Sequence, residues 1–240
     1  MLSEIEISKI LFIDIETVPQ KQSFDELSEK MQLLWDKKSS HFRTEDQEAE
    51  DVYSRAGIYA EFGKIICISA GIIVKEKGIH KIKIKSYKGD DEKAILSDFA
   101  DMLEIYSSEK SIFLCAHNGK EFDYPFLARR ILINTIKLPD LLDNAGKKPW
   151  EIKHLDTMEL WKFGDYRHYT SLELLTTIFN ITSPKDDMDG SKVARVYWQE
   201  EDIDRIVDYC QNDVLAVAQL VLRYKGMELL QDKDIEIIKG

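Results

Sequence analysis

The sequence predicts a single α/β domain in which a mixed sheet is flanked by helices. A strand and a strand pair come first, and helices then alternate with further short strands, which is the order expected of a sheet covered by helices. The chain also has 240 residues, of which 44% are hydrophobic. That is enough for one generous core and favours one domain over residues 1–240.

The first strand is expected at residues 11–19, LFIDIETVP, where apolar residues at odd and even positions indicate burial on both faces. A helix is expected to begin at Ser23, because Glu26 completes a capping-box pattern and apolar residues follow at helical spacing. Residues 36–54 are rich in charge and lack periodicity, so we interpret them as a solvated excursion. Residues from about 20–60 are therefore expected to form a partly helical insertion.

Two β-rich runs at residues 64–74 and 79–87 predict an antiparallel pair with a turn near Gly78. A helix near residues 91–106 and a strand at 111–116 are expected next. The rest of the chain is predicted to be mainly helical, with helices near 124–134, 157–162, 170–179 and 201–223, a loop at 137–149 and a short strand possible at 153–156.

Charge and cysteine content limit the classes of function. The net charge of −11 counts against nucleic-acid binding through Lys and Arg, although divalent metals can carry positive charge into an acidic cleft. The absence of a run of 18 apolar residues and an acidic N-terminus predict a cytoplasmic protein without a membrane span. Cys67, Cys115 and Cys210 lie in apolar contexts and are expected to be reduced core residues.

Asp14 and Glu16 interrupt the first strand. They stand two residues apart, so their side chains point to the same side of the strand. Burial of a carboxylate is costly and neighbouring carboxylates repel each other, so a buried pair predicts a compensating cation. A solvent-exposed position at the end of the strand is an equally good interpretation of this pair alone.

Asp123 follows the predicted strand at 111–116, in the stretch HNGKEFDYPFLARR. Asn118 and Gly119 are typical of a turn, and Asp123 is placed to cap the helix that follows. The same position, just beyond the C-terminal end of a strand, is where α/β sheets place their ligand-binding groups. Taken alone, the stretch favours a helix cap.

Asp213 falls on the apolar face of the last predicted helix, DRIVDYCQNDVLAVAQL. Tyr209 lies four residues earlier and so sits one turn away on nearly the same face. A charge on a core-facing stripe requires a partner. A hydrogen bond between Tyr209 and Asp213 inside the core would satisfy that requirement.

The segments FIDIET, HNGKEFD and YCQND, in that order, resemble the three exonuclease motifs of the DEDD superfamily. The last is similar to the tyrosine subtype, since the histidine subtype would carry His at position 208, where this chain has Asp208. HLDTMELWKFGDYRHYTSLELL and SPKDDMDGSKV are similar to the predicted 3'-5' exonucleases related to the proofreading domain of family B DNA polymerases. The resemblance runs from about residue 10 to 222. It implies an RNase H-like fold with a five-stranded mixed sheet flanked by helices.

The resemblance also implies the site residues. Asp14, Glu16, Asp123 and Asp213 match the metal-binding carboxylates, and Tyr209 matches the tyrosine that orients the attacking water. The residues expected to bind substrate are Thr17, Asn118 and Phe122.

Four carboxylates suit Mg²⁺ or Mn²⁺ and suit zinc poorly. Two such ions about 3.5 to 4 Å apart can stabilise both the attacking and the leaving oxygen of a phosphoryl displacement. We therefore expect two ions, with Asp14 bridging both, Glu16 and Asp213 holding the one that activates water, and Asp123 supporting the other through water.

The expected activity is removal of nucleoside 5'-monophosphates from 3' ends of single strands, with DNA as the expected partner and RNA as an alternative. An inactive RNase H-like nucleic-acid-binding module and a phosphodiesterase for small nucleotides are further alternatives. The binding module is disfavoured, because a binder gains nothing from four carboxylates that face phosphate.

Several other residues have simpler interpretations. Asp156, with Glu159 three residues later, reads as a capping box and stays outside the metal site. KDDMDG fails as a calcium loop, because an alignment on its glycine puts Lys185 at the first ligand position. The loop lysines Lys185 and Lys192 could touch phosphate. Four aromatic residues could stack on bases, although most are expected to pack in the protein: Phe122, Tyr124, Phe163 and Tyr166. His117 and His154 are expected to be turn or core residues.

Overall fold

The computed structural model describes residues 4–109, 112–165, 169–181 and 188–238. Its centre is a mixed six-stranded sheet in the order β5-β4-β1-β2-β3-β6. The strands are β1 (Ile10–Pro19), β2 (Gly63–Glu76), β3 (Ile79–Lys88), β4 (Phe113–Ala116), β5 (Leu155–Asp156) and β6 (Ile235–Ile238). The predicted mixed α/β fold is confirmed.

β1 pairs antiparallel with β2 and parallel with β4, which in turn pairs parallel with β5. β2 and β3 form the predicted antiparallel hairpin. The turn passes through Lys77 and Gly78, and Gly78 has a φ of 88°, in the left-handed region that favours glycine. The expectations of a hairpin and of a turn near Gly78 are therefore confirmed.

β6 is the strand that the sequence did not predict. It pairs parallel with β3, with Ile235 opposite Ile82, and makes the sheet six-stranded where five strands were expected. Its four residues, IEII, are too few to show a strand period. The segment becomes a strand because the exposed edge of β3 supplies its hydrogen-bond partners.

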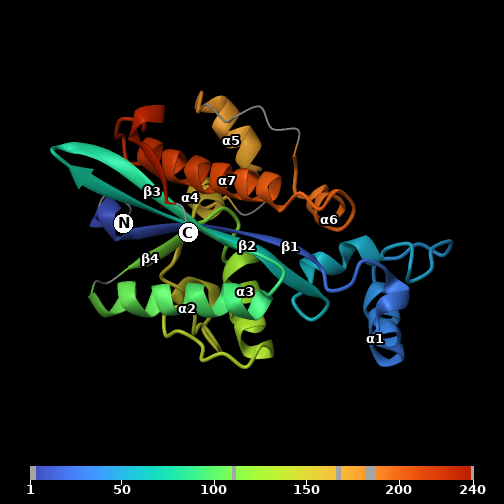
Figure 1. Cartoon of the computed structure of the whole chain (residues 1–240). Helices are drawn as coiled ribbons and strands as arrows, with labels where there is room; N and C mark the ends of the chain where they lie inside the picture. Colours follow the sequence, from blue (N-terminus) through green and yellow to red (C-terminus); the bar gives the residue numbers. More distant parts are fainter. Residues whose placement is uncertain (1–3, 110–111, 166–168, 182–187, 239–240) are drawn as a thin grey trace.

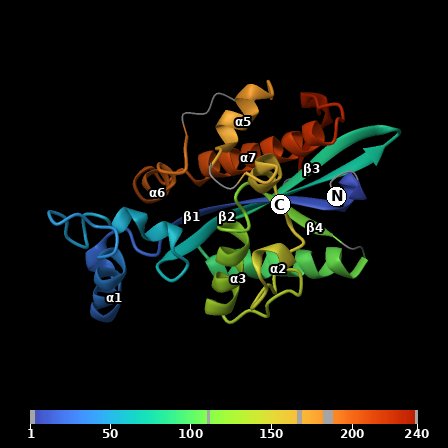
Figure 2. The ribbon, with the colours of Figure 1, turned by 180° about the vertical axis from the view of Figure 1, so that it is seen from behind.

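Helices cover both faces of the sheet, with α7 (Ile203–Tyr224) on one face and α2 (Glu92–Glu109) and α3 (Asp123–Ile133) on the other (Figures 1 and 2). On β1, Ile10 and Phe12 pack with residues of α7. Leu11 and Ile13 pack with residues of α2 and α3 instead. Because strand side chains alternate, the even-numbered carboxylates of β1 also fall on the α7 side.

The insertion forms the lobe beside the end of β1 (Figure 1). Its helix, α1, spans Glu29–Ser39 and is capped by Ser28, whose Oγ accepts a hydrogen bond from the Met31 amide at 3.4 Å. The expected start at Ser23 is wrong. Ser23 and Glu26 instead form a short 3₁₀ turn, and the chain extends at Leu27 to bury that side chain in the lobe.

The expectation that residues 36–54 are a solvated excursion is only partly correct. Seven side chains of the lobe form a hydrophobic cluster of their own: Leu27, Trp35, Ala49, Val52, Tyr53, Ala56 and Phe62. The Trp35 indole donates to the carbonyl of Ala49 at 2.8 Å. The apolar residues come from turns as well as from α1, so they follow no single period and the sequence pattern does not reveal them.

The remaining helices agree with the predictions except for one segment. α4 (Thr157–Lys162) and α5 (Leu172–Ile178) lie within the expected ranges. α6 (Val193–Arg195) runs into a π-helical turn, Val196–Glu200, and this segment was not predicted. Among the described residues, no helix is both long enough and apolar enough to span a membrane.

Candidate active site

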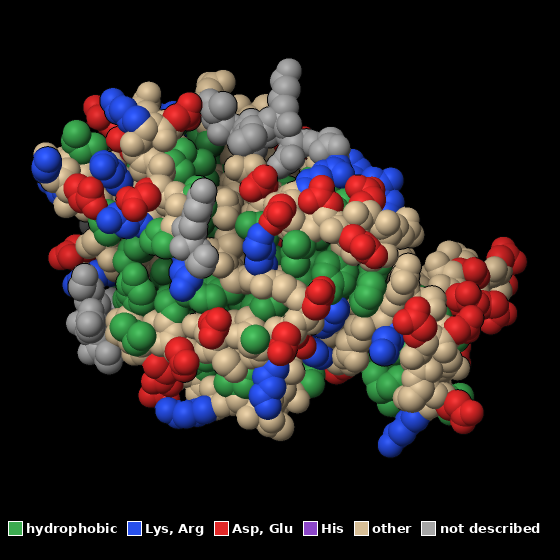
Figure 3. Space-filling view, in the orientation of Figure 1, with side chains coloured by type: hydrophobic (Ala, Val, Ile, Leu, Met, Phe, Trp, Pro, Cys, Tyr) green, Lys and Arg blue, Asp and Glu red, His purple; other side chains and the backbone are tan. Residues whose placement is uncertain are grey.

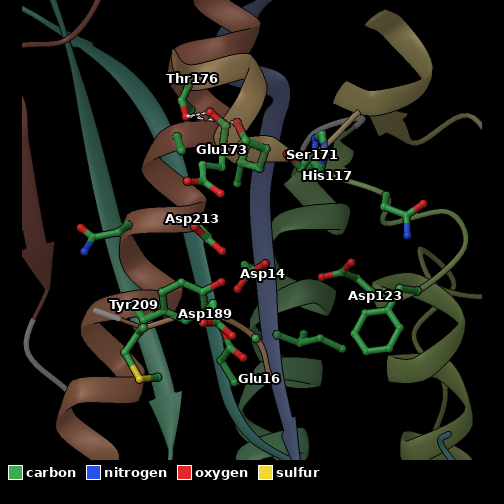
Figure 4. A pocket seen from close by; sticks show the side chains of 18 of the residues that line it. Asp14, Glu16, His117, Asp123, Ser171, Glu173, Thr176, Asp189, Tyr209 and Asp213 are labelled. Carbon is green, nitrogen blue, oxygen red and sulfur yellow. Dashed lines mark hydrogen bonds between the residues drawn. The ribbon is translucent and has the colours of Figure 1, made fainter. Parts of the chain in front are cut away.

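A cavity of about 1040 Å³, here called the catalytic cavity, opens between β1, the start of α3, α5 and α7 (Figure 4). Six carboxylates line it: Asp14, Glu16, Asp123, Glu173, Asp189 and Asp213. Among the described residues that line it, Lys192 is the only Lys or Arg. So many acidic groups around one space make it a site for cations.

Asp14 and Glu16 enter the cavity from β1, on the side covered by α7. In the pairing with β2, they lie opposite Ser69 and Cys67. The register with β2 shifts between Glu16 and Thr17, so the strand is irregular directly after the two carboxylates. Glu16 is 6% exposed and Asp14 is half-buried, and both lie within β1, so the interpretation of the pair as a solvent-exposed strand end is wrong.

Asp123 is the first residue of α3 and faces Asp14 across the cavity (Figure 4). The N-cap of α3 is Phe122, so Asp123 does not cap its own helix. The pKa of Asp123 is raised to about 7, mainly by burial and also by the charges of Asp156 and Asp213, while hydrogen bonds from its own amide and from the Ile15 amide oppose the shift. The hydrogen bond from Ile15 ties the carboxylate to β1.

Asp213 and Tyr209 project from α7 into the same cavity, one turn apart (Figure 4). Burial is the main cause that raises the pKa of Tyr209, followed by the charge of Asp213, to which the hydroxyl donates a hydrogen bond. The expected tyrosine-aspartate contact is therefore present. Because both side chains line the cavity, the contact lies at the site and not within a closed core.

Asp14 and Glu16 are strongly perturbed. Burial raises the pKa of both carboxyl groups well above their usual range, and the charges of neighbouring carboxylates add to the shift. Asp14 Oδ2 is also buried without a hydrogen-bond partner among the described residues. A buried carboxylate oxygen without a donor fits a metal ligand, and oxygen ligands of this kind suit Mg²⁺ or Mn²⁺.

Cys210 lies beside this pair, with Sγ and one carboxylate oxygen each of Asp14 and Glu16 within 4.8 Å of one another. The thiol donates to the backbone carbonyl of Asp14 at 3.4 Å. Burial raises the pKa of Cys210 well above its usual range, which keeps it a neutral thiol. Cys67, Cys115 and Cys210 are all buried and free, as predicted.

Two of the three predicted substrate-binding residues line the cavity. Asn118 and Phe122 do so, and Asn118 Oδ1 is buried without a hydrogen-bond partner in the described part of the chain. Asn118 also adopts a φ of 61°, a left-handed conformation that asparagine tolerates. Thr17, after the register shift, is not among the lining residues.

Asp156 caps α4 as predicted, with Oδ1 accepting from the amides of Met158 at 2.9 Å and Glu159 at 3.3 Å. The same carboxylate also accepts from the amides of Asn118 and Lys120, each at 3.1 Å. The second pair of bonds fixes the turn that presents Asn118 to the cavity. The sequence pattern predicted the helix cap and did not predict the hydrogen bonds to the Asn118 and Lys120 amides.

His154 is a core residue, as expected, whereas His117 also lines the catalytic cavity. His117 bonds to Thr157 Oγ1 and to the Thr170 carbonyl, each at 2.9 Å. His154 Nδ1 accepts from the Leu114 amide at 3.2 Å, and Nε2 lies 2.7 Å from the Leu141 carbonyl.

The other aromatic and lysine candidates differ in where the structure places them. Tyr124 is buried and donates to the Leu155 carbonyl at 2.6 Å, whereas Phe163 is 87% exposed. Lys185 and Tyr166 lie outside the described residues. Lys192 lines the cavity and pairs with Asp189 at 3.1 Å.

Sequence reasoning missed Glu173 and Asp189 as cavity residues. Glu173 projects from α5, and Asp189 lies in the turn before α6 (Figure 4). Asp189 belongs to KDDMDG, which was tested only as a calcium loop. The acidic run was the available signal for Asp189, and no comparable signal marks Glu173.

Comparisons with known proteins agree with this geometry. Residues 58–236 match a family described as predicted 3'-5' exonucleases related to the exonuclease domain of PolB. The matched range contains Asp123, Tyr209 and Asp213 and begins after Asp14 and Glu16. No curated protein matches the chain.

Among solved structures, the chain is similar to the family B DNA polymerase from the hyperthermophilic archaeon Pyrobaculum calidifontis. The TM-score is 0.53 at 14% sequence identity, over 90% of this chain and 24% of the polymerase. The likeness concerns the fold, and the chain spans about a quarter of the polymerase.

Proposed function

This chain belongs to the predicted 3'-5' exonucleases related to the exonuclease domain of PolB, and we propose that it removes nucleotides from the 3' end of single-stranded DNA by a two-metal mechanism. The products are nucleoside 5'-monophosphates. The observation that carries the proposal is the convergence of Asp14, Glu16, Asp123 and Asp213 on one cavity with Tyr209 beside them.

The donor set fits Mg²⁺ or Mn²⁺, as the unpartnered oxygen of Asp14 indicates. Asp14, Glu16, Asp123 and Asp213 would hold the ions in this site. When bound, two such ions supply charge that stabilises the attacking and leaving oxygens of the phosphodiester.

Tyr209 orients the attacking water in this proposal. The charges around it and its burial raise the pKa of its hydroxyl, so the hydroxyl keeps its proton at neutral pH. A neutral hydroxyl beside Asp213 can hold a water by one hydrogen bond without binding metal itself. Tyr209 therefore positions the nucleophile and does not act as a base.

Asn118 and Phe122 hold the 3'-terminal nucleotide. Asn118 Oδ1 has no partner among the described residues and can accept from a sugar hydroxyl or a base amino group. Phe122 offers an aromatic face on which a base can stack. A substrate contact by Thr17 stays a prediction.

The experiment is a time course with matched 5'-end-labelled DNA and RNA strands in Mg²⁺ and in Mn²⁺. We expect stepwise shortening from the 3' end, faster on DNA than on RNA, and no cutting of a circular single strand. The matched control is Asp213→Asn, which should be inactive on every strand. Cutting of the circle at a comparable rate would instead assign an endonuclease, and a preference for RNA would assign an RNA-trimming enzyme.

A further inference from the structure

A second cavity of about 350 Å³, here called the insertion cavity, lies between the insertion and α6 with its π-helical turn. Figures 1 and 2 both place α6 next to the insertion and beside the start of α7. One wall includes Phe24, Asp51 and Tyr53, and the facing wall includes Ala194, Arg195 and Trp198. Gln22 Nε2 donates to the Trp198 carbonyl at 3.3 Å and ties the walls together.

The insertion cavity adjoins the catalytic cavity. Gly190 and Lys192 line the catalytic cavity, and Ser191 between them lines the insertion cavity. Successive Cα atoms are only about 3.8 Å apart, so a single turn separates the two spaces. A Cβ added to Gly190 would meet no atom of the described residues within 4 Å. A strand with its 3' end in the catalytic cavity can continue across this turn.

The lining of the insertion cavity suits a nucleobase. Phe24, Tyr53 and Trp198 supply aromatic rings, and glutamine and serine side chains supply hydrogen-bonding groups between them. Aromatic faces stack on every base, because every base has a π face. The volume lies near the lower end of the range of ligand sites, roughly 300–1,000 Å³, which suits one base and not several.

Charge sets the direction in which a strand would lie. Glu50 and Asp51 on the insertion wall belong to an exposed acidic run at residues 45–51, in the lobe where acidic side chains gather in Figure 3. These carboxylates repel phosphate and can accept hydrogen bonds from base amino groups. Arg195 on the facing wall is the only Lys or Arg among the lining residues that the structure describes. The sugar-phosphate chain would therefore follow α6, with the base turned toward the insertion.

Trp198 gives an independent sign of a ligand. Its Nε1 is buried and has no hydrogen-bond partner among the described residues. A buried donor without an acceptor is costly, and in a native structure it calls for an explanation. The only other such atoms in the described chain are on Asp14 and Asn118, both in the catalytic cavity. A small turn of the indole toward a base carbonyl or ring nitrogen would satisfy Nε1.

We infer that the insertion cavity binds one base of the single strand on the 5' side of the scissile bond. This inference rests on the proposed function and gives the insertion a role in holding substrate. The base stacks against the aromatic rings of both walls, and its phosphate lies toward Arg195.

The test uses oligodeoxynucleotides that carry one abasic site, moved stepwise away from the 3' end. In the wild-type protein, one internal position should raise KM about tenfold, near the lower end of the effect of one stacked base. Ala194→Trp fills the insertion cavity. It should raise KM for the intact strand to a similar extent and remove the penalty at that internal position, while the penalty at the 3'-terminal position remains.

The matched control is Ala94→Trp, an equal change at an exposed position of α2 outside both cavities, which should keep the wild-type profile. Trp198→Phe removes the unpartnered donor together with part of the ring, so it should raise KM for the intact strand. A flat abasic profile in an active wild-type enzyme would overturn the inference and leave the exonuclease activity intact. Dissociation of a dimer by Ala194→Trp, with an unchanged profile, would instead assign the cavity to an interface between copies.

Discussion

The carboxylate of Asp156 accepts a hydrogen bond from the backbone amide of Asn118, across 38 residues of sequence, at 3.1 Å. One buried side chain thus caps α4 and fixes the turn that brings Asn118 to the catalytic cavity. Asp156 touches neither substrate nor metal in the proposed mechanism. It is a positioning residue, and its loss should act through Asn118.

The first prediction concerns Asp156→Asn. The asparagine side chain keeps one acceptor oxygen but places its NH₂ group against backbone N–H donors. Some of these buried backbone amides then lose their acceptor, which should lower the unfolding free energy by about 1–3 kcal/mol. KM should rise because Asn118 is displaced. The measurements are urea unfolding and steady-state kinetics. Ser28→Ala, which removes the cap of α1 far from the cavity, should leave KM unchanged. An Asp156→Asn enzyme with wild-type KM would contradict the positioning role.

Divalent metal should stabilise the protein through the carboxylates. A ligand at one hundred times its dissociation constant adds about 2.7 kcal/mol to the unfolding free energy. Asp14→Asn and Asp213→Asn should abolish turnover, and without metal they should be as stable as the wild type or slightly more so, because repulsion falls. Their melting temperatures should rise less with Mg²⁺ or Mn²⁺. Equal rises in all three proteins would contradict the assignment of these ligands.

Tyr209→Phe separates water orientation from metal binding. The ring and every carboxylate remain, and the hydroxyl's bonds to Asp213 and to the attacking water are lost. A tyrosine that only orients water should contribute at or below the low end of positioned acid-base groups, so kcat should fall by about ten- to a hundred-fold. KM and the metal-induced melting shift should stay near the wild type. Inactivity equal to that of Asp213→Asn would show a structural or ligand-orienting role, and full activity would return Tyr209 to core packing.

The metal-free protein should lose stability as the pH rises. Folding raises the pKa of Asp123 from 3.8 to about 7, so the folded state holds a proton that the unfolded state has released. That contribution to stability is complete below about pH 4 and is lost as the pH rises through 7. Between pH 6 and 8 the loss of unfolding free energy from Asp123 alone should be on the order of 1 kcal/mol. Urea unfolding in the presence of a chelator measures this loss, and the unfolding free energy of Asp123→Asn should fall less steeply with pH than that of the wild type. Equal dependence on pH in the two proteins would contradict the assignment of the loss to Asp123.

The sequence by itself determined which side chains share a face. The period of two in a strand aligned Asp14 with Glu16, and the helical period aligned Tyr209 with Asp213. Both relations depend only on local backbone geometry, and the structure places both pairs in the catalytic cavity. Motif resemblance then connected them with Asp123. The cap at Asp156 was equally visible, because it depends on residues three positions apart.

Tertiary structure decided what local periods cannot encode. β6 became a strand because an edge of β3 was open to it. Glu173 and Asp189 line the catalytic cavity because α5 packs against α7 and the turn before α6 lies at the same cavity. The cluster around Trp35 contains apolar residues from separate turns, so no hydrophobic periodicity in the sequence predicts it. Asp156 acquired its second task only when β5 came to lie beside β4. Contacts of this kind depend on the packing of distant segments, which a single sequence does not display.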